Sequence, residues 1–208
     1  MNISVNDWIS RLAKRSFDLL VSILGLIVFA PLMLAIAFFI LVTLGRPAMY
    51  SPRRVGKSGN LFTVHKFRTM TMDDTATSHH SGDDDPRITT EGRWMRKFKL
   101  DEVPQLLNVG KGEMSFVGPR PETPDYTKLY TDEQKVILEL RPGITDFASI
   151  EFADLGAILV GDDPDKIYFE KVRDRKMELR MKYVRERSFW IDLKLIFLTF
   201  AAVINRKK

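Results

Sequence analysis

LLVSILGLIVFAPLMLAIAFFILVTL, residues Leu19–Leu44, runs for 26 residues without a formally charged side chain. About 20 apolar residues are enough to cross the roughly 30 Å of hydrocarbon in a bilayer. A cleavable signal peptide has an apolar core of only about 7 to 15 residues, followed by a cleavage site of small residues. This stretch is longer and lacks such a site. We therefore predict a membrane segment that stays on the protein.

Pro31, preceded by Ala30, lies near the middle of this segment. Proline removes one backbone donor, and its ring clashes with the carbonyl of Ile27, so we expect the helix to bend and break at Ala30–Pro31. Each half would then be about 18 to 21 Å long, too short to cross the bilayer alone. We predict a re-entrant helix-break-helix. A proline-kinked helix that spans the membrane is the alternative.

The charges beside the apolar segment favour the re-entrant arrangement. Basic residues mark the cytoplasmic side of a membrane protein, and here they lie on both sides of the segment. Both flanks are therefore expected in the cytoplasm, which a straight spanning helix does not allow. The basic residues are Arg11, Lys14 and Arg15 before the segment and Arg46, Arg53, Arg54 and Lys57 after it.

The C-terminal end carries a second membrane signal. Its apolar surface is interrupted by Asp192 and Lys194, and the uninterrupted run Leu195–Ile204 is too short to span. We predict an amphipathic helix at the membrane interface, with packing on the protein core as the alternative. The chain then divides into an N-terminal amphipathic and re-entrant part (1–45), a cytoplasmic domain (46–187) and a C-terminal interfacial helix (188–208).

The composition fits one folded unit with membrane attachments. Among 208 residues, 45% are hydrophobic and 28% are charged, which lies outside the disordered and collagen-like classes. The absence of cysteine excludes disulfides, a thiolate nucleophile and cysteine-ligated metal sites. The net charge of +5 suits an anionic membrane surface, an anionic small substrate or a nucleic acid, and does not distinguish them.

The cytoplasmic domain has more helix signals than strand signals. It lacks both G-x-G-x-x-G and G-x-x-x-x-G-K-S/T, so we expect an irregular, mostly helical α/β domain without a Rossmann sheet. The expected elements are a hairpin of Ala48–Val55 and Leu61–Met70, a loop over Met72–Arg87, helices over Gly92–Leu100 and Val103–Val109, a helix from the Thr131–Gln134 capping box to Leu140, and a long helix from Asp163–Pro164 towards Arg187.

The loop over Met72–Arg87 holds residues that could bind a metal. His79 and His80 are adjacent, and Asp83–Asp85 follow them. Adjacent side chains point apart on an extended chain, so a solvated loop is the favoured interpretation and a metal site is the alternative.

Asp101 and Glu102 are the adjacent acidic residues that most clearly suggest a chemical role. Arginines beside proline or glycine accompany them, as Arg120 does in Gly118–Glu122. Such arginines can be held ready to grip a phosphate with two parallel hydrogen bonds. A carboxylate facing that substrate could bind magnesium or attack phosphorus. The plainer alternative is an N-cap aspartate, a glutamate that complements the helix dipole, and ordinary surface arginines.

Three strings in order carry a resemblance to a known family. They are KFRTM (residues 66–70), LDEVPQLLNVGKGEMSFVGPRP (residues 100–121) and RPGIT (residues 141–145), all after an apolar segment broken by proline. The sequence closely resembles the monotopic phosphoglycosyl transferases, bacterial sugar transferases that start glycan assembly on a polyprenyl phosphate. The resemblance covers about residues 14–204, the minimal catalytic form.

The resemblance implies a reaction and a set of partners. A sugar 1-phosphate would move from a UDP-sugar to undecaprenyl phosphate, with release of UMP and with Mg²⁺, at the cytoplasmic face of the bacterial inner membrane. Asp101 maps to the nucleophile and a magnesium ligand, and Glu102 to its catalytic neighbour. A helix N-terminus would lower the pKa of Asp101 and keep it ionised. The candidate substrate-binding residues are Arg54, Lys66, Arg68, Arg96, Arg120 and Arg141.

The sequence departs from the family pattern at several places, and other functions remain open. Ala30 replaces the usual serine before Pro31, and Pro52, Lys99, Asp146 and Ser149 also differ, which leaves the sugar undetermined. The alternatives are a membrane-tethered scaffold for anionic lipid or nucleic acid and a hydrolase of nucleotide diphosphates that uses water as acceptor. Under the transferase hypothesis, we expect contact with the lipid bilayer and no binding of nucleic acid, and a homodimer is possible.

Overall fold

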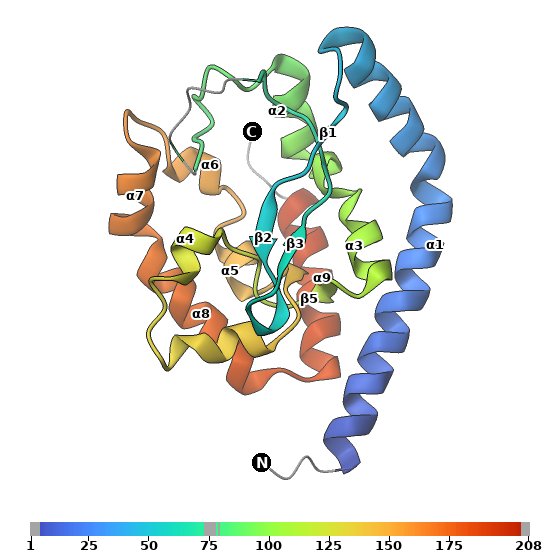
Figure 1. Ribbon diagram of the computed structural model, residues 1–208, viewed down its shortest axis with the longest axis vertical. Coiled ribbons are helices and arrows are strands. Elements are labelled where there is room, and N and C mark those ends of the chain that lie inside the picture. Colours follow the sequence, from blue (N-terminus) through green and yellow to red (C-terminus); the bar gives the residue numbers. More distant parts are fainter. Residues whose placement is uncertain (1–4, 73–77, 79, 205–208) are drawn as a thin grey trace.

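The computed structural model describes residues 5–72, 78 and 80–204, with only the backbone for residues 5–11. Its first element, α1 (Val5–Thr43), is one α-helix of 39 residues with Pro31 inside it. Separate helices on either side of Ala30–Pro31 were expected, and this expectation is wrong. The ribbon is bent but not interrupted (Figure 1). Proline removes a single donor, and bending relieves the clash of its ring, so the hydrogen bonds on either side survive.

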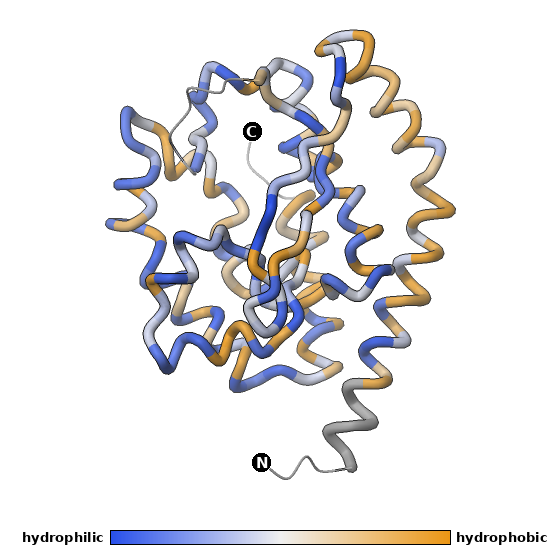
Figure 2. The backbone as a smooth tube through the Cα atoms, viewed as in Figure 1, coloured by the Kyte–Doolittle hydropathy of each residue, from blue (hydrophilic) through white to orange (hydrophobic). Residues whose placement is uncertain are grey.

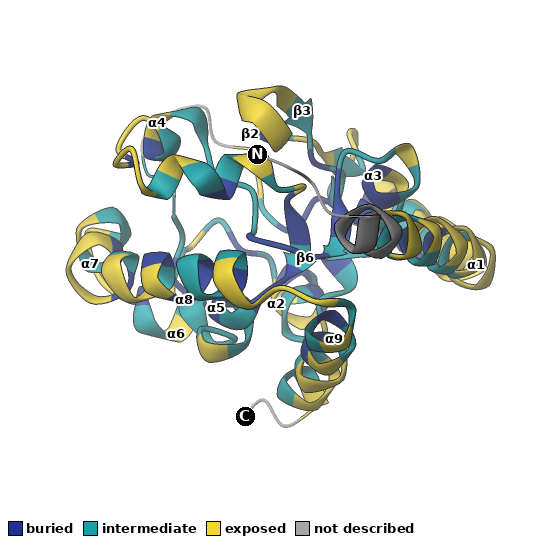
Figure 3. Cartoon of the chain, turned by 90° about the horizontal axis from the view of Figure 1, so that it is seen from below, coloured by how far each residue is buried: buried dark blue, intermediate teal, exposed yellow. Residues whose placement is uncertain are grey.

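Most of α1 is exposed and apolar. Within the described residues, Leu12–Thr43 is the one helical segment long and apolar enough to cross a membrane, and only 11% of its most apolar window is buried. Hydrophobic residues follow α1 on the side away from the rest of the protein, and this side is solvent-exposed (Figures 2 and 3). A helix inside a soluble core would be mostly buried, so this exposure fits a membrane anchor.

Polar contacts fasten the N-terminal part of α1 to the rest of the protein. Lys14 pairs with Asp192 of α9 (Phe189–Ile204). The guanidinium of Arg15 donates to the carbonyl oxygens of Val109 at 2.7 Å and Gly110 at 2.9 Å. These partners lie in α3 (Gln105–Lys111) and in the C-terminal helix, so the start of the apolar segment rests against both.

The C-terminal end of α1 is also fastened to the rest of the protein. The buried guanidinium of Arg68 donates to the carbonyl oxygens of Leu44 (2.5 Å), Gly45 (2.7 Å) and Arg46 (3.3 Å). Carbonyls that follow a helix have no partner within it, and a cation there also complements the helix dipole. The residues that pack together at this end are Ile36, Ile40, Phe67 and Met95.

The strands are short and form three separate pairs. β1 (Met49–Tyr50) pairs antiparallel with β4 (Lys66–Phe67), and β2 (Arg53–Val55) with β3 (Leu61–Thr63), around the 3₁₀ turn η1 (Lys57–Gly59). The predicted hairpin is therefore present, divided into two pairs.

The third strand pair is parallel and depends on glycine. β5 (Ser115–Val117) pairs with β6 (Gly143–Thr145). A Cβ atom on Gly143 would lie 2.1 Å from the backbone nitrogen of Gly118, so no larger residue fits at this crossing.

The helices before the parallel pair match the prediction with small shifts. α2 (Thr90–Lys97) begins where Thr89 accepts a hydrogen bond from the amide of Gly92 at 2.9 Å. The 3₁₀ turn η2 (Leu100–Glu102) and α3 (Gln105–Lys111) follow. α3 packs against α1 and thereby positions the acidic pair close to the membrane segment.

The later helices are shorter than predicted. The Thr131–Gln134 capping box is present, with Gln134 N donating to Thr131 Oγ1 at 3.3 Å, but the helix that follows is the 3₁₀ helix η3 (Gln134–Glu139). The predicted long helix is two helices, α7 (Pro164–Lys171) and α8 (Arg173–Glu186), divided at Val172. The remaining short helices are α4 (Pro124–Thr127), α5 (Phe147–Glu151) and α6 (Leu155–Ile158).

α9 combines both interpretations offered for the C-terminal segment. Asp192 and Leu195 are buried against the domain, while Trp190, Phe197 and Phe200 are strongly exposed. One face thus packs on the protein, and the other carries an apolar surface that points away from the core (Figure 3).

Candidate active site

Asp101 and Glu102 lie in the 3₁₀ turn η2, which connects α2 to α3. Lys99 enters this turn in the left-handed conformation with φ 56°, and it turns the chain sharply after α2. Asp101 is only 7% exposed, and its Oδ1 atom has no hydrogen-bond partner among the described residues. A buried carboxylate oxygen without a partner is costly to a folded protein, which indicates that a ligand completes the site.

Glu102 is held by two cations. Arg120 donates from both terminal nitrogens to the two carboxylate oxygens, at 2.9 and 2.7 Å, and Lys66 Nζ lies 3.1 Å from Oε1. Burial alone would raise the pKa of Glu102, but Arg120, Lys66 and Lys99 outweigh burial and hold the pKa well below its usual range. Glu102 is therefore ionised, and its two oxygens are engaged.

Asp101 has the opposite electrostatic character. Burial raises the pKa of Asp101, the neighbouring Glu102 raises it further, and Lys66, Lys99 and Arg96 only partly compensate. The expectation that a helix N-terminus lowers this pKa is wrong, because Asp101 lies in the turn before α3 and not at the start of that helix.

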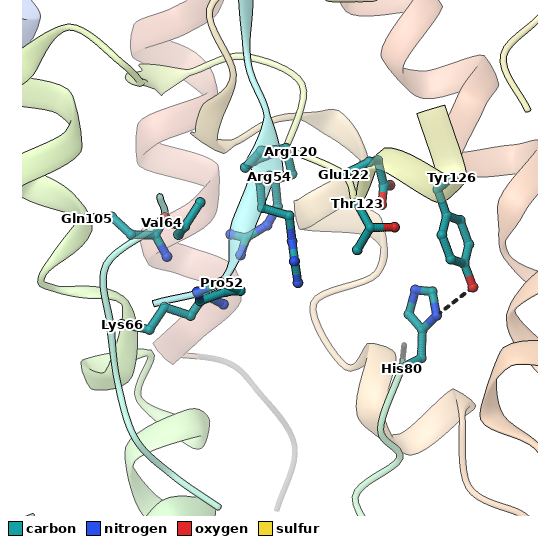
Figure 4. A pocket seen from close by; sticks show the side chains of 11 residues that line it. Pro52, Arg54, Val64, Lys66, His80, Gln105, Arg120, Glu122, Thr123 and Tyr126 are labelled. Carbon is teal, nitrogen blue, oxygen red and sulfur yellow. Dashed lines mark hydrogen bonds between the residues drawn. The ribbon is translucent and has the colours of Figure 1, made fainter. Parts of the chain in front are cut away.

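A pocket of about 150 Å³ opens beside this acidic pair. Figure 4 shows Gln105, Val64 and Lys66 at one end, Arg54 and Arg120 in the middle, and His80 with Tyr126 at the other end. Asp101 is not one of the lining residues, but the two cations that hold Glu102 are. The lining residues are Pro52, Arg54, Val64, Lys66, His80, Gln105, Arg120, Pro121, Glu122, Thr123 and Tyr126.

Glu122 forms a second ionic centre on the pocket wall. Its Oε1 lies 3.1 Å from Lys176 Nζ and 2.7 Å from Arg180 Nη2, both on α8. Burial would raise the pKa of Glu122, but Lys176 and Arg180 lower it to about 2. Glu122 did not stand out in the sequence, although it follows the Gly118–Pro121 string. Its partners lie more than fifty residues away in the sequence, so only the fold could reveal the pairing.

The far end of the pocket is aromatic. His80 Nδ1 lies 2.8 Å from Asp165 Oδ1 and 3.1 Å from the Tyr126 hydroxyl, and its ring stacks on Tyr168 at 4.0 Å between centroids. Burial lowers the pKa of His80 despite Asp165, which favours the neutral ring. These contacts tie the loop before α2 to α4 and α7. Figure 4 shows the contact between His80 and Tyr126. The sequence indicated His80 only as an alternative metal ligand.

The predicted substrate-binding residues fall into two groups. Arg54, Lys66 and Arg120 line the pocket. Arg96 lies close enough to Asp101 to interact with its charge, but its side chain donates to Thr69 Oγ1 at 2.9 Å and Ser81 Oγ at 3.2 Å.

Arg68 and Arg141, the other two predicted substrate-binding residues, do not line this pocket. The guanidinium of Arg68 is engaged by the carbonyls that follow α1. Arg141 is exposed and donates to Gly112 O at 3.0 Å. Proximity to glycine and proline in the sequence therefore does not place an arginine at the site.

The acid-rich loop was the alternative metal site that the sequence offered. No group of three or more His, Asp or Glu side chains that could hold a metal lies within the described residues, and His79 lies outside them. Magnesium, however, often binds through one or two carboxylates and completes its shell with water and substrate phosphates. The unpartnered Oδ1 of Asp101 fits such a ligand.

Comparison with known proteins places this site in a family. The family described as "Bacterial sugar transferase" matches residues 9–206. The chain is 39% identical over 191 residues to an uncharacterized sugar transferase, EpsL, of Bacillus subtilis, covering 92% of this chain and 87% of the relative. It is 36% identical over 203 residues to the undecaprenyl-phosphate glucose phosphotransferase of Komagataeibacter xylinus, covering 94% of this chain.

A third similar protein is the undecaprenyl-phosphate galactose phosphotransferase of Salmonella typhimurium, 36% identical over 213 residues and 95% of this chain. The chain spans 36% of the length of the Komagataeibacter relative and 41% of the Salmonella relative. The family match, residues 9–206, includes α1 from residue 9 onward, the acidic pair and the pocket.

Proposed function

The chain belongs to the bacterial sugar transferase family, and from this premise we propose that it transfers a sugar 1-phosphate from a UDP-sugar to undecaprenyl phosphate and releases UMP. The relatives named for undecaprenyl-phosphate phosphotransferase activity support the acceptor and the reaction type. The observation that carries the proposal is the buried Asp101, whose Oδ1 has no partner among the described residues. Its neighbour Glu102 is held by Lys66 and Arg120, and these two cations line the pocket.

The proposed first step uses Asp101 as the nucleophile. One carboxylate oxygen attacks the phosphorus that bears the sugar, a new P–O bond forms, and the P–O bond to UMP breaks with its electrons going to UMP. In the second step a phosphate oxygen of undecaprenyl phosphate attacks the same phosphorus. The aspartyl bond breaks, the lipid carries the sugar on a diphosphate, and Asp101 returns as a carboxylate.

The other residues hold the diphosphate and balance its charge. Arg54, Lys66 and Arg120 line the pocket, and cations aimed at a diphosphate lower the repulsion that an approaching carboxylate meets. Glu102 keeps Arg120 and Lys66 in place through three contacts of 3.1 Å or less. Asp101 would also hold Mg²⁺, which supplies further neutralisation of phosphate charge when bound.

For the membrane, we propose that α1 enters and leaves on the cytoplasmic face of the inner membrane. Both ends of its apolar segment contact the same domain, through Lys14 and Arg15 at one end and Arg68 at the other. A helix crossing a bilayer would separate these ends by about 30 Å of hydrocarbon, with the polar domain on one side only. The bend in α1 and the basic flanks support the same arrangement.

The test is UMP release from a panel of UDP-sugars with Mg²⁺, with and without undecaprenyl phosphate. If a lipid-linked sugar diphosphate forms in the same amount as the released UMP, the result supports the transferase. Continuous UMP release without acceptor would indicate the hydrolase, in which water attacks instead. Binding of anionic lipid or nucleic acid without any turnover would indicate a scaffold.

A further inference from the structure

Two buried carboxamides lie one turn apart on α3, and they are used differently. Asn108 is fully buried and engaged throughout: it accepts from His65 N at 3.0 Å and donates to Thr63 O and Glu113 Oε2, each at 2.7 Å. Its amide therefore connects α3 to the end of β3 and to the residues that follow it. Such a residue has a structural role.

The carboxamide nitrogen of Gln105 is not engaged in this way. Gln105 is 1% exposed, and its Nε2 atom has no hydrogen-bond partner among the described residues. Burying an amide donor without a partner reduces stability, so a sequence keeps it only where something else is gained. Gln105 lines the pocket, at the Lys66 end that adjoins the acidic pair (Figure 4).

The surroundings of Gln105 indicate what completes its hydrogen bonding. Arg54, Lys66 and Arg120 line the same pocket, which suits an anion with several oxygens. On the opposite wall, Thr123 Oγ1 also lacks a partner among the described residues. The pocket thus contains unpaired polar atoms on two sides and positive charge between them.

We propose that the Gln105 carboxamide donates a hydrogen bond to a non-bridging diphosphate oxygen of the nucleotide-sugar donor; this inference rests on the proposed function. The Lys66 end of the pocket lies beside the acidic pair, so the bonded oxygen belongs near the reacting phosphorus. A neutral donor suits that place. A further cation there would pair with the Asp101 carboxylate and hold it away from phosphorus.

The experiment measures the thermal shift caused by UDP with Mg²⁺, and the rate of UMP release, in three variants and the wild type. Gln105→Met is close to isosteric and removes the unpaired amide. We expect it to melt no lower than the wild type, to lose most of the UDP-induced shift, and to lose about tenfold to a hundredfold in kcat/KM for the donor.

Two comparison variants separate ligand contact from structure. Gln105→Glu keeps the shape, adds a negative charge that Lys66 can accommodate, and should lose more UDP binding than Gln105→Met. Asn108→Ala removes a fully bonded amide on the same helix, so it should melt lower while the folded protein keeps the UDP-induced shift.

The outcomes distinguish this inference from the proposed function. If Gln105→Met melts lower and keeps the full UDP shift and turnover, Gln105 is structural and the inference is overturned. The same holds if the wild type shows no UDP-induced shift at all. If UDP binding depends on Gln105 but no UDP-sugar yields UMP, the contact stands and the transferase proposal falls.

Discussion

Asp101 and Glu102 are adjacent carboxylates placed in opposite electrostatic environments. Glu102 accepts two hydrogen bonds from Arg120 and one from Lys66, and its pKa lies well below its usual range. Asp101 keeps one oxygen without a partner among the described residues, and its burial raises its pKa. One carboxylate is thus fixed as a structural anion, and the other remains available for chemistry.

Replacing Asp101 by Asn should abolish UMP release and also stabilise the protein. The pKa of Asp101 is higher in the folded protein than in the unfolded chain. The free energy of unfolding is therefore highest at low pH, where Asp101 is protonated, and it falls as the pH rises through the folded-state pKa. At neutral pH the ionised side chain therefore destabilises the fold. Without Mg²⁺, we expect Asp101→Asn to melt about 2 to 4 °C higher at pH 7.5, for a gain of roughly 1 kcal/mol.

The control is Asp162→Asn, at an exposed loop position. It should leave both activity and melting temperature unchanged. If Asp101→Asn retains UMP release, another residue is the nucleophile; if it melts lower than the wild type, Asp101 has a structural partner in the folded protein.

Arg120 and Arg141 should respond differently to replacement by Lys. Arg120→Lys would keep the charge but lose the two-pronged hydrogen bond to Glu102, and we expect at least a tenfold fall in UMP release, from about 1.5 kcal/mol or more of lost interaction. Arg141→Lys should stay within about twofold, because Arg141 is exposed and lies outside the pocket. Equal losses in both variants would show that Arg141 also contacts substrate.

At the scale of elements, α1 is more than a tether. Lys14 and Arg15 attach its first part to α9 and α3, and Arg68, which directly follows β4, attaches its end. α3, which carries Gln105, packs along the helix between these points. α1 therefore contacts the helix that directly follows the acidic pair, and this contact helps to position the pair.

Cysteines placed before and after the apolar segment should be labelled from the same side of the membrane. Ser16 and Lys57 are both exposed and lie outside the contacts that fasten α1, so Ser16→Cys and Lys57→Cys suit this cysteine-free chain. In inside-out vesicles, we expect a membrane-impermeant maleimide to label both. Labelling of the two sites from opposite sides would establish a spanning helix and overturn the re-entrant proposal.

The Lys14–Asp192 pair should couple α1 to α9 energetically. Lys14→Met leaves the buried Asp192 carboxylate without its cation, and we expect a loss of about 3 kcal/mol in unfolding free energy. In the wild type, the Tyr183 hydroxyl donates to Asp192 Oδ1 at 2.7 Å. Asp192→Asn in the Lys14→Met background should recover part of the lost stability, because the amide oxygen can accept the same hydrogen bond and carries no charge. Additive effects in this double-mutant cycle would mean that the two side chains do not stabilise each other.

The whole molecule combines the two surfaces that the proposed two-substrate reaction requires. The pocket with its cations suits a soluble diphosphate donor. The exposed apolar faces of α1 and α9 suit the bilayer that holds the acceptor (Figures 2 and 3). The proposed donor is soluble and the proposed acceptor is held in the bilayer, so we expect the two to use the site in turn.

This arrangement predicts ping-pong kinetics with a covalent intermediate on Asp101. Varying the UDP-sugar at several undecaprenyl phosphate concentrations should give parallel lines in double-reciprocal plots. Incubation with UDP-sugar and Mg²⁺ without acceptor should leave a sugar-phosphate on the peptide that contains Asp101, detected by mass spectrometry. Intersecting lines together with no adduct would point to direct transfer, and the family assignment would stand.

The sequence by itself determined the features that depend on local composition. The uncharged stretch around Pro31 predicted a long apolar helix, and the spacing of Thr131 and Gln134 predicted a capping box at that place. The sequence strings around Asp101 indicated the family. Each is a property of neighbouring residues, whose physical meaning does not wait for folding. What the sequence missed or misjudged involves residues far apart along the chain.

Only the tertiary structure decided how each charged side chain is used. Arg68 and Arg120 look alike in the sequence, but the fold directs one to the carbonyls that follow α1 and the other to Glu102. The fold also raised the pKa of Asp101 by burying it. Desolvation and pairing depend on which distant groups surround a side chain, and local sequence does not carry that information.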